Sequence, residues 1–111
     1  MTKDDFFVIA YKILAYLYAC LKAGEDPKLE EISDSRLNIP ERYWYSIITM
    51  LYREGYIEGM KEINTVWMPE TYYSFDRPTI TVKGIEYLED NSMMKKARDA
   101  LKELKAMVPG L

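Results

Sequence analysis

The hydrophobic pattern of this chain changes its period at Gly55, and this change constrains the fold more than any other feature. Before Gly55 the apolar residues recur at intervals of three and four, which is typical of one helix face. After it, two short runs have the pattern of extended strands. The chain has 111 residues, which is enough for one domain. We therefore expect a single mainly α-helical domain, residues 1–111, with a small antiparallel β-hairpin.

The first helix is predicted within residues 1–24. Thr2 and Asp5 have the spacing of a capping box, so the helix should begin near Lys3, and Gly24 should end it. The apolar stripe of this helix consists of Phe6, Ala10, Ile13, Leu14, Leu17 and Leu21. Such a stripe should pack against the other helices.

Residues 26–54 have the pattern of two further helices joined by a turn. Asp26 and Pro27 open a short helix whose Leu29 and Ile32 should point inward, and Pro40 opens the next helix. The core-facing stripe of this third helix consists of Trp44, Ile47, Ile48 and Leu51. We expect a helix-turn-helix.

The hairpin, which we call the wing, is predicted over residues 55–81. The connection between its strands contains Pro69 and Pro78, so we expect it to be long and packed by its own side chains. Its aromatic residues are Trp67, Tyr72, Tyr73 and Phe75.

Two helices should follow the wing in residues 82–108. Thr81 can cap the first, and Asn91 and Ser92 separate it from the second. Pro109 and Gly110 should end the second helix. The apolar seam of the second helix consists of Met94, Ala97, Leu101, Leu104 and Val108.

This order of elements is that of a winged helix-turn-helix with an added C-terminal helix. The residues Tyr43-Trp44, Ile47-Ile48, Leu51, Gly55-Tyr56-Ile57-Glu58-Gly59, Ile80-Thr81 and Gly84-Ile85-Glu86-Tyr87-Leu88 carry a more specific likeness. In these residues the chain resembles the YjcQ family, small proteins of Gram-positive bacteria and their phages. The resemblance implies a winged-helix fold and a prophage setting, and no established activity.

A winged-helix protein would place its third helix in the major groove of double-stranded DNA. At about 100° per residue, the face opposite the core stripe carries Arg42, Ser46, Thr49 and Arg53, with Tyr45 on its flank. Arginine can bind guanine through two hydrogen bonds, and hydroxyl groups can contact any base. Lys61 and Arg77, at the ends of the hairpin, could bind phosphates.

The charge balance argues against strong DNA binding. Residues 28–53 contain four basic and four acidic side chains, and the whole chain has a net charge of -3. Non-specific affinity for DNA comes mainly from neutralising phosphates, so this region should bind weakly unless a dimer doubles its contacts. Two hypotheses therefore stay open: a phage-type DNA-binding protein with a role as a transcriptional regulator, and a phage-encoded protein-interaction module.

The interaction module would bind another phage or host protein through Trp67, Tyr72, Tyr73 and Phe75, although these rings could instead close the core beneath a long loop. The seam that includes Met94, Leu101 and Leu104 must be covered by the first helix or by a second copy of the chain. A homodimer formed through this seam is a further hypothesis, which concerns self-association. It would hold two third helices about one DNA turn apart.

Enzymatic and membrane functions are not expected. Histidine is absent and Cys20 is the one cysteine, which excludes His-based catalysis, Cys/His zinc sites and intrachain disulfides. We find no phosphate loop or nucleophile motif, and we predict no metal, cofactor or catalytic residues. The polar N-terminus, and the lack of an apolar run of about 18 residues, predict a cytoplasmic protein with no membrane contact.

Overall fold

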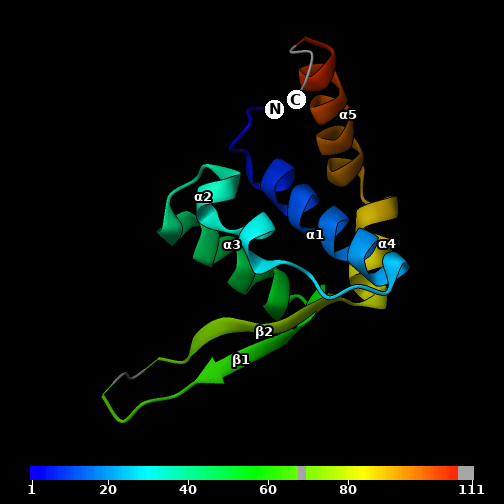
Figure 1. Cartoon of the computed structure of the whole chain (residues 1–111). Coiled ribbons are helices and arrows are strands. Elements are labelled where there is room, and N and C mark those ends of the chain that lie inside the picture. The colour runs from blue at the N-terminus through cyan, green and yellow to red at the C-terminus, as the bar shows by residue number, and fades with distance from the viewer. Residues whose placement is uncertain (68–69, 108–111) are drawn as a thin grey trace.

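A computed structural model describes residues 1–67 and 70–107, and the side chains of these residues as far as 103. The protein is mainly helical with one two-stranded antiparallel sheet, as expected, and the arrangement is compatible with a winged-helix-like fold (Figure 1). Its elements in chain order are α1 (Phe6–Ala23), the 3-10 helix η1 (Leu29–Ile32), α2 (Asp34–Leu37), α3 (Glu41–Arg53), β1 (Ile57–Ile63), β2 (Tyr72–Ile80), α4 (Val82–Asp90) and α5 (Ser92–Met107).

Helix α1 begins at Phe6, three residues after the expected start. Asp5 is itself the N-cap, and its carboxylate accepts a hydrogen bond of 2.9 Å from the amide of Phe7. The predicted capping box is wrong because the Thr2 hydroxyl donates to Asp4 instead. Leu21 is also not part of the core, since it is 47% exposed near the end of the helix. The buried face consists of Val8, Ile9, Ala10, Ile13, Leu14 and Leu17.

Helix α1 is the centre of the molecule, in contact with α3, α4, α5 and β2. Its 18 residues have a mean hydropathy of 1.6, so among the described residues it alone is long and apolar enough to cross a membrane. The expectation that the chain lacks an apolar run of about 18 residues is therefore wrong. One third of the helix is buried inside the protein, and core helices of soluble proteins have the same composition. The compact globular shape favours a soluble protein, and the cytoplasmic location stays a prediction.

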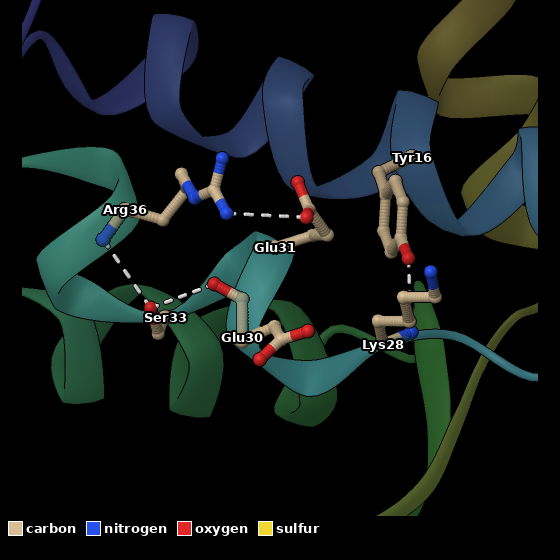
Figure 2. A network of polar contacts seen from close by, with 6 residues as sticks. All are labelled: Tyr16, Lys28, Glu30, Glu31, Ser33 and Arg36. Carbon is tan, nitrogen blue, oxygen red and sulfur yellow. Dashed lines mark hydrogen bonds and ion pairs between the residues drawn. The ribbon is translucent and has the colours of Figure 1, made fainter.

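The expected second helix is divided into η1 and α2, and Ser33 lies between them. The Ser33 hydroxyl accepts from the amide of Arg36 at 3.2 Å and donates to the carbonyl of Glu30 at 2.8 Å (Figure 2). The Arg36 guanidinium lies 3.3 Å from the carboxylate of Glu31. Because the Ser33 side chain forms hydrogen bonds with the backbone on both sides of it, it explains why the helix is interrupted at this residue.

A tyrosine of α1 holds the segment that leads into η1. The Tyr16 hydroxyl accepts a hydrogen bond of 2.9 Å from the amide of Lys28, and Figure 2 shows its ring reaching from α1 toward that segment. Ile32 is buried as expected, whereas Leu29 is 40% exposed, so the inward position predicted for Leu29 is wrong. The helix-turn-helix is therefore fixed to α1 before α3 begins.

The hairpin has a bulge near its base. Glu58 pairs with Thr79 and Met60 pairs with Phe75, so Gly59 faces three residues of β2. The added residues accommodate Pro78, which lacks the amide that a regular ladder needs. A Cβ on Gly59 would overlap the carbonyl of Arg77, which explains the glycine there. Strand β2 already begins at Tyr72, so the expectation that Tyr72, Tyr73 and Phe75 lie in a loop is wrong.

The two C-terminal helices return to α1. The Thr81 side chain accepts from the amide of Gly84 at 3.0 Å, which confirms the predicted cap of α4. Asn91 caps α5 by accepting from the amides of Met93 and Met94. The predicted end of α5, at Pro109 and Gly110, lies outside the described residues, as does Val108.

Candidate nucleic-acid interface

Helix α3 is held firmly by the elements around it. Ile47, Ile48 and Leu51 are at most 2% exposed, which confirms most of the predicted core stripe. The indole N–H of Trp44 donates to the carbonyl of Ile32 at 2.7 Å, so a half-buried tryptophan connects α3 to η1. A helix fixed in this way can present its outer face in a defined orientation.

The outer face of α3 consists of four exposed residues: Arg42, Ser46, Met50 and Arg53. The Ser46 hydroxyl donates to the carbonyl of Arg42 at 3.0 Å, and both arginines are exposed. The guanidinium of Arg53 lies over the ring of Tyr73, 5.8 Å from the ring centroid. Within the described part of the chain, neither arginine forms an ion pair. The sequence reading missed Met50, which is 51% exposed at the middle of this face. Met50 lies four residues after Ser46, and this spacing places both side chains on the same helix face, so the sequence could have identified it.

Two residues predicted for the interface have other roles in the structure: one is buried, and the other holds the wing. Thr49 is only 6% exposed, and its hydroxyl donates to the carbonyl of Tyr45 at 2.8 Å, so its predicted exposure is wrong. The Tyr45 hydroxyl accepts from the amide of Tyr73 at 3.0 Å, and its ring stacks on Tyr72 at 4.9 Å. The flank of α3 that Tyr45 occupies is therefore covered by β2.

The aromatic residues of the wing divide into two groups. Phe75 packs edge-on against Trp44 with 5.6 Å between ring centroids, and both Phe75 and Tyr73 are half-buried. Tyr73 also packs on Tyr52 at 5.2 Å. These contacts agree with closure of the core, and they leave Tyr73 and Phe75 little free surface for a partner. Trp67, by contrast, is 91% exposed.

The environment of Tyr52 shows that negative charge lies close to this face. Burial raises the pKa of Tyr52, and the nearby carboxylate of Glu62 raises the same pKa further. The Tyr52 hydroxyl donates to that carboxylate at 3.4 Å. Glu70 also lines the shallow groove of about 220 Å³ between α3 and the start of β2, on the side of Arg53. A phosphate there would meet both signs of charge.

The two cations predicted at the ends of the hairpin differ in their surroundings. Lys61 is exposed on β1, where it pairs with Ser74 of β2. Arg77 instead lies 3.5 Å from the carboxylate of Asp26, in the segment that follows α1, and both side chains are at least 80% exposed. The contact seen for Arg77 is thus with the end of α1, and the structure does not bring it to the outer face of α3.

All of these elements except the first turns of α1 are included in a family match. The model of the family described as YjcQ protein matches residues 11–107. The chain belongs to the YjcQ family. A relative from Bacillus subtilis (strain 168), named Uncharacterized protein YjcQ, is 32% identical over 112 residues, which cover 95% of this chain and 96% of the relative. No solved structure matches the chain significantly.

One of the three residues predicted for the C-terminal interface is internal in this YjcQ-family chain. Met94 and Ala97 are fully buried in the chain's own core, where α5 packs on α1, so Met94 is not available to a second copy. Leu101 is half-buried. Leu104 belongs to α5, and its side chain lies outside the described part. Across the described residues, no group of three or more His, Cys, Asp or Glu side chains could hold a metal ion.

Proposed function

We propose that this YjcQ-family protein is a non-enzymatic DNA-binding protein of the winged-helix type, with a phage or prophage setting and a role in transcriptional regulation. Helix α3 would enter the major groove, and Arg42, Ser46 and Arg53 would contact bases and phosphates. The observation that supports this proposal is the outer face of α3, on which two exposed arginines flank a hydroxyl group on a helix fixed to the core.

The distribution of charge determines what kind of binding to expect. Residues 28–53 contain equal numbers of basic and acidic side chains, and residues 57–80 contain two basic and four acidic ones. The gain from releasing counterions should therefore be small, and most of the affinity would come from base contacts. A homodimer on a two-fold symmetric site would double those contacts, so we include dimerisation on DNA in the proposal.

The test is a selection of binding sites from a random duplex library at about 50 mM salt, where electrostatic contacts count most. We expect one sequence to be enriched, and the Arg42→Ala/Arg53→Ala variant to bind it at least about tenfold more weakly, since a bidentate arginine contributes about 1–3 kcal/mol. The matched control is Lys95→Ala/Lys96→Ala, which removes the same charge from exposed positions of α5. A library without enrichment, or equal affinity of the α3 variant and the parent, would contradict the proposal.

A second candidate function is favoured by the tip of the wing. Val66 is 97% exposed and Trp67 is 91% exposed, and the acidic wing is a poor ligand for DNA. Exposed tryptophans are frequent energetic centres of protein interfaces. We infer that the tip could bind a phage or host protein with a basic rim around an apolar pocket.

This candidate can be tested with a photoreactive amino acid at position 67 in the cells that produce the protein. We expect one discrete crosslinked adduct with a partner. The same amino acid at position 82, where Val82 is 73% exposed on α4, serves as the control. Identical adducts from both positions would reflect random collisions and would rule out a specific role of the tip.

A further inference from the structure

A groove between α1 and α5 combines cations with an apolar floor. In Figure 1, α1 lies between α3 and α5, so this groove is separate from the outer face of α3. Its volume is about 410 Å³, within the range of small-ligand sites. Its walls consist of Tyr11, Lys12 and Ala15 from α1 and Arg98, Leu101 and Lys102 from α5.

Lys12 is the most unusual residue of the groove. It is a half-buried lysine within a helix that is otherwise mostly apolar. Burial lowers the pKa of Lys12, and the positive charge of Lys3 lowers it further. Within the described residues, its ammonium group has neither an ion pair nor a hydrogen bond. Lys12 also lines a second hollow together with Lys3 and Asp4. Because removing a charge from water is costly without a partner, an anion that reaches Lys12 from the groove would stabilise it.

Arg98 and Lys102 contribute the other two positive charges. They are four residues apart, so they lie on the same side of α5. Arg98 forms an ion pair of 3.4 Å with the adjacent Asp99, and both side chains are more than 40% exposed. Exposed pairs of this kind are weak and can open for a ligand. Three cations therefore line the groove, and none of the six residues that form it is acidic.

The floor of the groove is apolar, which a purely ionic ligand would not require. Tyr11, Ala15 and Leu101 are half-buried and keep part of their apolar surface in contact with solvent. Covering this surface is favourable at about 25 cal/mol per Å². The ligand that matches both features has a negative head and a hydrocarbon tail.

The length of the groove favours a small molecule over a helix of another protein. Among the residues whose side chains the structure describes, its lining spans little more than one turn on each helix, from Tyr11 to Ala15 and from Arg98 to Lys102. A docked amphipathic helix would contact its groove over two turns or more, at positions i, i+3, i+4 and i+7. A single hydrocarbon chain needs only the shorter stretch.

We propose that the groove between α1 and α5 binds a small amphiphilic anion, a carboxylate or phosphate head with a hydrocarbon tail. The head lies among Lys12, Arg98 and Lys102, and the tail covers Tyr11, Ala15 and Leu101. This site is independent of the proposed DNA contacts on α3, so either can fail without the other.

The test is calorimetry with dodecanoate and with dodecyl phosphate, each below its critical micelle concentration. We expect saturable binding at one site for at least one of them, and the preferred compound identifies the head group. Dodecyltrimethylammonium has the same tail and the opposite charge, and butyrate has the head with a short tail. Both should bind at least about tenfold more weakly, because each lacks one of the two contributions.

Variants then locate the site. Lys12→Gln and Lys102→Gln should each weaken dodecanoate binding at least about fivefold, consistent with loss of a charge-assisted contact. Lys22→Gln is the matched control, because it removes the same charge from an exposed position of α1 outside the groove. Circular dichroism confirms that each variant is folded. Equal binding of the groove variants and the parent, equal binding of the cationic amphiphile, or no saturable binding of either anion would overturn the proposal.

Discussion

The base and the tip of the hairpin belong to one continuous ribbon and have opposite surroundings. At the base, Ile57 and Ile80 are at most 3% exposed and belong to the hydrophobic core. At the tip, Val66 and Trp67 are more than 90% exposed. The last contact with α3 that the structure shows is the stacked pair of Tyr72 and Tyr45. Burial in the core therefore explains the apolar residues at the base of the hairpin, and the exposed apolar residues of the tip need another explanation.

Figure 1 shows the same division in space, since the hairpin extends well beyond the end of α3. Burial at the base should make substitutions there costly, whereas substitutions at the tip should leave the free energy of unfolding unchanged. A series of variants along the ribbon can test this difference.

The largest effect is expected where α4 meets the base. A Cβ on Gly84 would overlap the carbonyl of Tyr56 and come within 2.8 Å of the Ile80 side chain. Gly84→Ala should therefore lower the free energy of unfolding by about 3 kcal/mol, because backbone has to move. Urea denaturation measures this value. Glu86→Ala, at an exposed position of the same helix, should change it by less than about 0.5 kcal/mol. Equal effects of the two substitutions would contradict the close packing.

The next effect concerns the aromatic contact of the wing with α3. Phe75→Ala removes a half-buried ring that packs on Trp44, and we expect a loss of about 2 kcal/mol, less than for a fully buried phenylalanine. The nearby Ser74→Ala, which has no ring to lose, serves as the control in the same urea experiment. A stability equal to that of the parent would show that the base of the wing does not depend on this contact.

The sequence predicted the buried residues of α3 better than it predicted the wing. Ile47, Ile48 and Leu51 could be assigned to the core because their spacing repeats within one helix. Thr49 lies between the core stripe and the outer face, and it is buried, with its hydroxyl bonded to the carbonyl of Tyr45. The helical spacing alone does not show whether a residue at this boundary is buried or exposed. The prediction that Thr49 is exposed failed for this reason.

The wing was harder to predict because prolines suggested a long loop. Pro78 lies at the bulge opposite Gly59, so the strand continues through it and begins as early as Tyr72. The contact of Gly84 with the hairpin could not be predicted from the sequence either, because a glycine within a helical pattern indicates only a low helix propensity. The candidate site was thus half predictable: Arg42, Ser46 and Arg53 were placed correctly on the exposed face.

A smaller effect is expected at the last contact before the tip. Tyr45→Phe removes the hydroxyl that accepts a hydrogen bond from the amide of Tyr73 and keeps the stacking on Tyr72. The free energy of unfolding should fall by about 1 kcal/mol, the usual contribution of one hydrogen bond. Hydrogen exchange of the Tyr73 amide should accelerate in the variant. An unchanged exchange rate would show that this bond does not protect the strand.

The smallest effect is expected at the tip itself. Trp67→Ser should change the free energy of unfolding by less than about 0.5 kcal/mol, because the indole is 91% exposed and has almost no contact to lose. Acrylamide quenching should show one readily accessible indole in the parent and none in the variant, since Trp44 is half-buried. A loss of more than about 1 kcal/mol would mean that the tip folds back onto the protein. An unchanged stability leaves partner binding as the reason for an exposed tryptophan, and the photocrosslinking experiment at position 67 then decides whether such a partner exists.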